Sequence, residues 1–380
     1  MRFDFHYGPT LRMGAGSACD LAEMLPHRRM LIVTDPGVRR AGLLDAPLAA
    51  LVAAGREVTI FDAVEADPSR ETVLSAVSTA MEAAAECVIG FGGGSPMDVA
   101  KLVAYLARSG DSLDRIWGVG LATDMRLPLA LVPTTAGTGS EATPVTIVTV
   151  AGGEKRGVSS RQLLPDWAVL DPELTVGLPR SATAATGIDA MVHAIEAYTS
   201  AILKNPLSDM LARQALLLLS THLLTACEEP GNITAREAML LGAHLAGVAF
   251  ANAPVGGVHA LAYPLGGHFH VPHGLSNALM LTHVLTFNMP GARALYAELG
   301  VLLDPALAGL GEQAKAQGLI ASLERLIEGS GLVMGLSSVG VRRDQLDLLS
   351  DEAMKQQRLL KNNPVAITRE DAYRLYEAAL

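Results

Sequence analysis

A change in pattern near residue 178 constrains the fold of this 380-residue chain more than any other feature. Before it, short runs of β-branched and aliphatic residues alternate with helical periodicity. Strands that alternate with helices are typical of parallel βαβ units, so the first part is predicted to form an open α/β sheet. The predicted strands cover residues 30–34, 57–61, 87–91, 129–133 and 145–150, and the clearest helices between them cover 70–85 and 97–107.

After this point the periodicity is helical throughout. Long apolar-periodic segments predict helices over residues 209–227 and 235–251, and Thr234 with Glu237 has the spacing of a capping box for the second of these. Pro172 and Pro179 interrupt any helix that would continue across the change in pattern. We therefore predict an α/β domain over residues 1–178 and an all-helical domain over residues 179–380.

A triple-glycine turn follows the predicted strand 87–91 and leads directly into a helix. Glycines allow a ligand to approach the backbone closely, Ser95 could cap the helix, and Pro96 suits its first turn. Free N–H groups at a helix N-terminus bind anions, so this turn predicts a pyrophosphate site. It matches neither the usual dinucleotide fingerprint nor a nucleotide-hydrolase loop. A tight turn that binds nothing is the alternative.

Two further segments extend this hypothesis. Asp35 ends a predicted strand, where a carboxylate can accept a hydrogen bond from a ribose 2′-hydroxyl and repel a 2′-phosphate, which favours NAD over NADP. A turn-forming or capping aspartate is the alternative. Residues 133–141 contain four hydroxyl side chains and two glycines, which could surround a phosphate or a carboxamide, or simply form a solvated turn. Lys155 could add a positive charge.

The helical part contains a candidate metal site. Asp189 and His193 lie four residues apart, on one face of a predicted helix, and His259 and His273 lie in segments rich in Gly and Pro. Five of the ten histidines fall between residues 259 and 283, which indicates a site. One carboxylate with three neutral imidazoles suits Fe²⁺ or Zn²⁺, and the residues do not decide between the two metals.

Composition excludes several classes of function. A net charge of −10, few aromatic residues and no basic block argue against nucleic-acid binding. The three cysteines form no CxxC pair, so neither a disulfide framework nor a thiolate metal site is expected. The first residues carry charge where a signal peptide would be apolar, and the apolar stretches are expected to end before the length of a membrane span. We therefore expect a cytoplasmic protein with no membrane partner.

Four segments together resemble the iron-containing (group III) alcohol dehydrogenase family: GGGSPMDVAK, PTTAGTGSEAT, GIDAMVHAIEAY and HALAYPLGGHFHVPHGLSNA. They occur in the family's order along the whole chain. The resemblance implies an N-terminal dinucleotide-binding domain, an all-helical C-terminal metal-binding domain, a divalent metal, usually iron, in the cleft between them, and a homodimer.

The resemblance also assigns residues. The implied metal ligands are Asp189, His193, His259 and His273. The implied cofactor contacts are Asp35, Gly93, Gly94, Ser95, Asp98, Thr134, Thr135, Thr138 and Lys155. Val145 and Phe250 are implied to line a small apolar substrate pocket, which suggests short aliphatic alcohols, aldehydes or diols.

The chain departs from the family pattern at two positions. Tyr263 occupies a place where relatives often have a histidine beside the metal and the nicotinamide, so the proton relay would pass through Tyr263, His268 or His270, or directly to water. Asp67 precedes Pro68 where many relatives have asparagine, and this adds a negative charge that would further disfavour NADP.

The implied activity is hydride transfer between a nicotinamide and a small alcohol or aldehyde whose oxygen the metal polarises. A maleylacetate-reductase-like or polyol-oxidising relative is a near alternative. A dehydroquinate-synthase-like lyase is more distant, since it would need more basic residues to hold a phosphorylated acid. A helical metal-binding module without redox activity would leave the triple-glycine turn unexplained.

Overall fold

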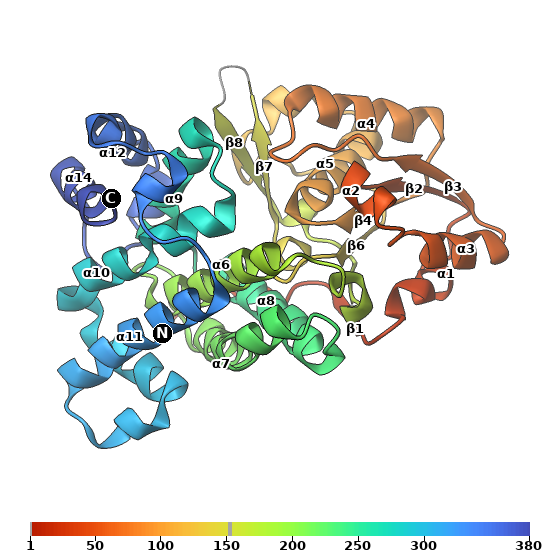
Figure 1. Cartoon of the computed structure of the whole chain (residues 1–380). Helices are drawn as coiled ribbons and strands as arrows, with labels where there is room; N and C mark the ends of the chain where they lie inside the picture. The colour runs from red at the N-terminus through yellow and green to blue at the C-terminus, as the bar shows by residue number, and fades with distance from the viewer. Residues whose placement is uncertain (1, 151–153) are drawn as a thin grey trace. The chain divides into compact units, whose positions relative to one another are not determined.

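The computed structural model of the protein describes residues 2–150 and 154–380 and divides into two compact units (Figure 1). One unit is Tyr7–Gly177, and the other joins Leu178–Leu380 with the segment that ends at His6. The prediction assigned this N-terminal segment to the α/β domain. It groups instead with the helical unit, where Asn252 exchanges hydrogen bonds of 2.8 and 2.9 Å with the backbone of His6.

The first unit is built on a six-stranded, fully parallel sheet with the order β1-β9-β6-β4-β2-β3. Four strands of this sheet, β2, β3, β4 and β6, form within one residue of the predicted bounds, whereas β1 and β9 were not predicted. The strands are β1 (Thr10–Met13), β2 (Arg29–Val33), β3 (Glu57–Phe61), β4 (Cys87–Gly92), β6 (Leu129–Pro133) and β9 (Trp167–Leu170).

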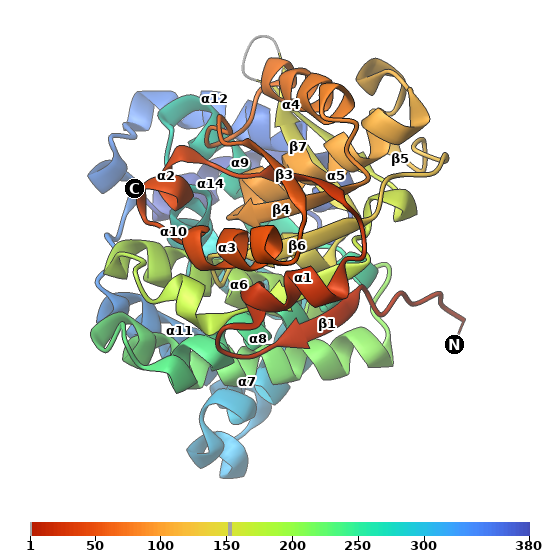
Figure 2. The same cartoon turned by 90° about the vertical axis from the view of Figure 1, so that its right-hand side faces the viewer.

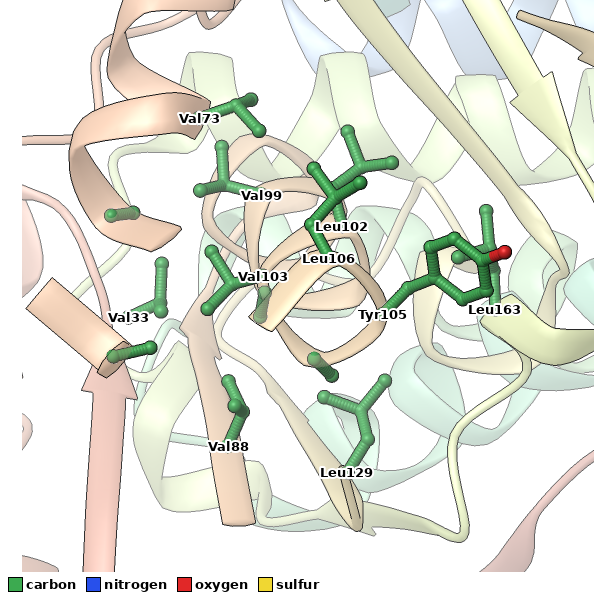
Figure 3. Packing of buried hydrophobic residues seen from close by; sticks show 14 of the residues in the cluster. Val33, Val73, Val88, Val99, Leu102, Val103, Tyr105, Leu106, Leu129 and Leu163 are labelled. Atoms are coloured by element: carbon green, nitrogen blue, oxygen red, sulfur yellow. The ribbon is translucent and has the colours of Figure 1, made fainter. Parts of the chain in front are cut away.

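Both faces of this sheet are buried, as is usual for parallel sheets. Successive side chains of a strand point to opposite faces. Leu31 and Val33 of β2 therefore join one core cluster, and Met30 and Ile32 join another. Figure 2 shows helices on both sides of these strands, and Figure 3 shows the cluster that contains Val33, to which Val73 of α4 and Val103 of α5 also belong. The helices are α1 (Leu21–Met24), α2 (Pro36–Arg40), α3 (Asp45–Ala53), α4 (Arg70–Glu82) and α5 (Gly94–Ser109).

One predicted strand lies outside the parallel sheet. Residues 145–149 form β7 (Val145–Thr149), which pairs antiparallel with β8 (Lys155–Ser159), and β5 (Gly118–Val119) completes a separate three-stranded sheet. The expectation that this strand joins the parallel sheet is wrong. A strand pattern indicates burial but no partner, and the short connection to β8 permits only an antiparallel hairpin.

The second unit is helical. Its main helices are α6 (Arg180–Thr199), α7 (Pro206–Glu228), α8 (Ile233–Asn252), α9 (Gly257–Phe269), α10 (His273–Leu303), α11 (Glu312–Ser330), α12 (Leu346–Met354), α13 (Gln357–Leu360) and α14 (Arg369–Ala378). The predicted capping box at Thr234 is wrong, because α8 begins two residues earlier than predicted, at Ile233, and the side chain of Asn232 caps it by accepting from the N–H of Ala235.

Helix α6 is almost completely buried from Thr183 onward. Gly187 permits this, since a Cβ added there would lie 2.5 Å from Leu223 of α7 and 2.7 Å from Met239 of α8. The neighbouring helices therefore approach the backbone of α6 directly. The result is a rigid central helix that carries Asp189 and His193 in its buried part.

Helix α7 is long and apolar enough to cross a membrane, with 23 residues and a mean hydropathy of 1.3. The bent pair α8 and α9 meets the same criterion. The expectation that every apolar stretch ends before such a length therefore does not hold for α7. Core helices of soluble proteins have the same length and composition, so this finding is weak evidence for a span.

Candidate metal centre and dinucleotide loops

Three helices bring one carboxylate and three imidazoles together. Asp189 and His193 project from adjacent turns of α6, His259 lies in the first turn of α9, and His273 is the first residue of α10. One ligand atom from each residue lies within 4.8 Å of every other. Asp189, His193 and His259 are buried, whereas the side chain of His273 is 40% exposed. The group is thus buried except at His273.

The spacing within this group fits a single metal ion. Nε2 of His259 and Nε2 of His273 lie 3.8 and 3.6 Å from Oδ1 of Asp189. Two ligand atoms that each lie about 2.1 Å from one ion are at most about 4.2 Å apart. Burial alone would raise the pKa of the Asp189 carboxyl, but the surrounding imidazoles and a hydrogen bond from Asn277 hold that pKa below its ordinary value. The residues therefore present an anionic oxygen and imidazole nitrogens to one point.

The start of α10 is fixed against α6 by a glycine. A Cβ added at Gly274 would lie 2.3 Å from the carbonyl oxygen of Ala185, which is a backbone atom in the middle of a buried helix. Neither helix can give way locally at this distance. Gly274 thus allows the close approach that places His273 beside Asp189.

We expect Gly274→Ala to force the start of α10 away from α6 and to separate His273 from Asp189. Overpacking of this kind costs about 1–3 kcal/mol, and metal affinity should fall with it. Urea denaturation and a metal titration would measure the two effects. Gly267→Ala in α9 is the matched control, because nothing lies within 4 Å of its added Cβ. Equal behaviour of the two variants would contradict this role of Gly274.

Aromatic side chains surround the imidazoles. The ring of Phe250 stacks on His193 with centroids 4.4 Å apart, and the ring of Tyr263 lies 5.8 Å from that of His273. The other two candidate relay residues lie elsewhere. His268 lies 4.0 Å from Glu352, and His270 ends α9 with a left-handed backbone and an exposed side chain. Neither belongs to the described group of ligand atoms within 4.8 Å.

In the first unit, the triple-glycine turn joins β4 to α5. Gly93 caps α5 and Gly94 is its first residue, so Ser95 lies inside the first turn and does not cap the helix. A Cβ at Gly94 would lie 3.0 Å from Thr138, and a Cβ at Gly93 would lie 3.7 Å from Oγ1 of Thr135. The turn therefore faces the threonine-rich loop at residues 134–138.

This threonine-rich loop contains an unsatisfied polar atom. Oγ1 of Thr135 is buried and has no hydrogen-bond partner among the described residues. The backbone N–H of Thr134 donates to the carbonyl of Gly92, and Oγ1 of Thr138 accepts from the N–H of Ser140. Buried polar groups are nearly always hydrogen-bonded in a working protein. An available Thr135 hydroxyl next to Gly93 fits a polar ligand at this turn.

Asp35 has a structural task at the end of β2. Its Oδ1 accepts hydrogen bonds from the N–H groups of Gly37 and Val38 and so caps α2. Its Oδ2 lies 3.1 Å from the position of a Cβ at Gly92. The capping alternative raised for this residue is therefore present, and the second oxygen still borders the glycine turn.

Asp98 and Lys101 of α5 tie the neighbouring loops to this helix. Asp98 accepts from the hydroxyl of Ser140 at 2.6 Å and from the N–H of Ile147 at 2.9 Å. The fully buried Lys101 donates to Ser140 and to the carbonyl of Val145, each at 2.8 Å. Burial lowers the pKa of Lys101, and Asp98 and Glu141 counteract this. Both carboxylate oxygens of Asp98 thus have partners within the protein. The resemblance implied that Asp98 contacts the cofactor, whereas these bonds are typical of a residue that supports the neighbouring loops.

The two remaining charges near this region form a pair. Nζ of Lys155 lies 2.6 Å from Oδ1 of Asp67. Asp67 has a left-handed backbone, and its carbonyl accepts from the hydroxyl of Thr149, which joins it to β7. The positive charge expected from Lys155 and the negative charge expected from Asp67 therefore offset each other.

Comparison with known protein families covers nearly the whole chain. Residues 9–172 match the model of iron-containing alcohol dehydrogenases, and residues 183–380 match the C-terminal model of the Fe-containing alcohol dehydrogenase family. The chain belongs to the iron-containing alcohol dehydrogenase family. The expected resemblance and the expected fold class are thereby confirmed, and the protein is an oxidoreductase of alcohols and aldehydes.

Three relatives of this dehydrogenase illustrate the likeness. Long-chain-alcohol dehydrogenase 1 of Geobacillus thermodenitrificans is 38% identical, over 98% of this chain and 95% of the relative. The structure of a 1,3-propanediol oxidoreductase has a TM-score of 0.96 and 33% identity, with all of both chains covered. The structure of sulfoacetaldehyde reductase from Bifidobacterium kashiwanohense with NAD⁺ has a TM-score of 0.88 and 28% identity, over 100% of this chain and 99% of the other.

Sequence reasoning missed one polar residue inside the ligand group of the dehydrogenase. Nδ2 of Asn277 donates to Oδ1 of Asp189 at 2.5 Å and lies 3.2 and 3.3 Å from Nε2 of His259 and His273. Asn277 follows His273 by four residues on α10, and this spacing was a signal that could have identified it. The amide holds the carboxylate in place beside the two imidazoles.

Proposed function

We propose that this dehydrogenase interconverts a small alcohol and its aldehyde or ketone with NAD, using a divalent metal held by Asp189, His193, His259 and His273. The observation that carries the proposal is the convergence of these four ligand atoms within 4.8 Å. Iron is the metal we propose, with zinc as the alternative, because nitrogen and carboxylate ligands suit both. A homodimer in the cytoplasm, without nucleic-acid or membrane partners, completes the proposal.

The side chains around the ligand group have separate tasks in this proposal. A bound ion would supply Lewis acidity toward the oxygen of the substrate. Asp189 contributes a negative charge that balances part of the ion's charge, and Asn277 orients its carboxylate. Phe250 stacks on His193 and shields that side from water. His273, with its 40% exposed side chain, marks the side on which substrate enters.

The glycine turn and the threonine-rich loop support NAD as the cofactor. The hydroxyl of Thr135 is available beside Gly93, and the first turn of α5 offers N–H groups to a pyrophosphate. Ser95, Thr134 and Thr138 belong to the same two segments. The contacts that we propose for this site are Asp35, Gly93, Gly94, Ser95, Thr134, Thr135, Thr138 and Lys155, with Asp98 as their support.

Asp35 supports NAD over NADP. Its Oδ2 is not engaged by the cap of α2 and borders Gly92, so a negative charge lies at the end of β2. A ribose hydroxyl can donate to such an oxygen, whereas a 2′-phosphate would be repelled. The relative from Bifidobacterium kashiwanohense with bound NAD⁺ is consistent with this preference.

The substrate is proposed to be short and largely apolar. Phe250 lies against the ligand group and is half-buried, and Val145 begins β7 with a half-buried side chain. The relatives named above act, by their names, on long-chain alcohols, propanediol and sulfoacetaldehyde. Substrate choice thus varies within one fold, and we assign it to such side chains in each protein.

The proposal is tested with metal-free protein that is reloaded with Fe²⁺ or Zn²⁺ alone. NADH formation should appear with short primary alcohols only after reloading, and NADP should be a much poorer cofactor. The reverse reaction with short aldehydes should consume NADH. Absence of turnover with both metals, over a panel of alcohols, diols and aldehydes, would contradict the proposed function.

The proton relay gives a further prediction. Tyr263 lies beside His273 and carries a phenol that can hold a proton at its Oη, so we propose it as the relay residue in place of His268 and His270. Tyr263→Phe should lower kcat by about 10²-fold, the usual contribution of a positioned acid or base, and should alter the pH profile of kcat. His268→Gln is the control and should leave the profile intact. An unchanged profile for Tyr263→Phe would remove it from the relay.

A further inference from the structure

Glu196 is a buried carboxylate one turn beyond His193 on α6. Its Oε1 accepts the backbone N–H of Val258 at 2.7 Å, and its Oε2 lies 2.6 Å from Nδ1 of His259. The two oxygens therefore hold two consecutive residues of α9. The residue before this helix is Gly256, which has no side chain to cap it. Glu196 thus satisfies an N–H of its first turn, where a negative charge is favourable.

The contact between Oε2 of Glu196 and Nδ1 of His259 also determines which nitrogen of His259 carries its proton. A carboxylate only accepts hydrogen bonds, so Nδ1 of His259 must donate. In a neutral imidazole Nε2 then keeps its lone pair. Nε2 is the atom that lies 3.8 Å from Oδ1 of Asp189 within the ligand group. The proton is therefore placed on the nitrogen that faces away from the group.

We propose that Glu196 is a positioning residue that fixes the tautomer and ring orientation of His259 and so prepares it to bind the metal. This inference rests on the proposed metal centre and extends it to a residue outside the ligand set. Carboxylates that hold a metal-binding histidine in this way typically raise metal affinity 10–100-fold. Glu196 therefore serves α9 twice, as its cap and as the anchor of its ligand.

A small cavity borders Glu196. Its volume of about 10 Å³ suits a single water molecule. Its lining is mostly apolar and includes the polar residues Thr199, Asn288 and Asn363, and the amides of Asn288 and Asn363 hydrogen-bond each other at 2.6 and 2.9 Å. The bonds from Val258 and His259 to the two carboxylate oxygens lower the cost of burying Glu196.

The first experiment measures affinity for Zn²⁺ alone by competition with a chromophoric chelator. Glu196→Gln preserves size but offers only one accepting oxygen for two donors, so affinity should fall 10–100-fold. Thr199→Val is the matched control that should bind like wild type, because Thr199 lines the same cavity and its hydroxyl donates to the carbonyl of Ile195. Wild-type affinity in Glu196→Gln would overturn the inference.

The second experiment observes the tautomer in the metal-free wild-type protein. ¹⁵N-labelled histidine and long-range ¹H–¹⁵N correlation distinguish the two forms, and His259→Gln identifies the signals by their loss. We expect a proton on Nδ1 of His259 in wild type and loss of this preference in Glu196→Gln. A proton on Nε2 in wild type would overturn the inference even if Glu196→Gln fails to fold.

The two measurements separate this inference from the proposed function. If wild type binds no Zn²⁺ or Fe²⁺, the metal centre itself is wrong, and the inference is overturned with it. If wild type binds the metal and Glu196→Gln binds it equally well, the metal centre stands and only the role of Glu196 is wrong. Weak binding together with the altered tautomer supports both.

Discussion

Asp189→Asn is expected to abolish metal binding and to lower kcat/KM for alcohol oxidation by at least about 10³-fold. A loss of this size corresponds to the several kcal/mol by which a metal ion stabilises the transition state. Asparagine keeps the shape of the side chain but removes the one negative charge among the four proposed ligands. It also changes the partner of Asn277, which donates to Oδ1 at 2.5 Å. The metal content of the purified protein and kcat/KM measure the effect.

Asp171→Asn is the control for this prediction. Asp171 is as buried as Asp189 and accepts hydrogen bonds from the backbone of Gly16 and Ala18, but it lies in the other unit. Its replacement should lower stability and leave the metal content unchanged. A metal-replete and active Asp189→Asn variant would rule out Asp189 as a ligand.

Lys101→Met is expected to lower the free energy of unfolding by about 3–5 kcal/mol, because it removes the fully buried partner of the ion pair between Lys101 and Asp98. The ammonium also donates to Ser140 and to the carbonyl of Val145, and both acceptors would lose this donor. The loop at residues 134–140 would lose one of its two anchors on α5 and keep the bond from Ser140 to Asp98. We therefore expect a weaker dissociation constant for NAD as well, measured by calorimetry beside urea denaturation.

Lys355→Met is the matched control, since Lys355 forms an exposed ion pair with Glu352. Such surface pairs contribute at most about 1 kcal/mol. The loss of stability in Lys101→Met should be several times larger than the loss in this control. A loss below about 1 kcal/mol, with unchanged NAD binding, would show that the loop is held by other contacts.

The fold of the first unit follows from strong local patterns. The inner strands β2, β4 and β6 are continuous apolar runs, because both of their faces are covered. Edge strands such as β1 are short and carry polar residues, so their sequence differs little from a loop. The pairing of β7 with β8 depends on where the chain turns, and residue periodicity does not encode that.

The candidate site shows the same division. His259 and His273 could be singled out because ligand residue types are few and these two lie in unusual glycine-rich segments. Asn277 and Glu196 could not be recognised by type alone, although both follow a proposed ligand at helical spacing. Their tasks depend on atoms of other helices, which only the folded structure brings near. Gly274 is another such residue, because the carbonyl of Ala185 on a different helix leaves no space for a Cβ there.

The four proposed ligands lie on α6, α9 and α10, so an ion bound to them would act as a removable cross-link between distant parts of the chain. A ligand that binds only the folded state adds about 2.7 kcal/mol to stability at one hundred times its dissociation constant. The melting temperature should therefore rise with free metal concentration and fall in chelating buffers. The heat resistance of this protein should therefore depend on the metal concentration around it as well as on its sequence.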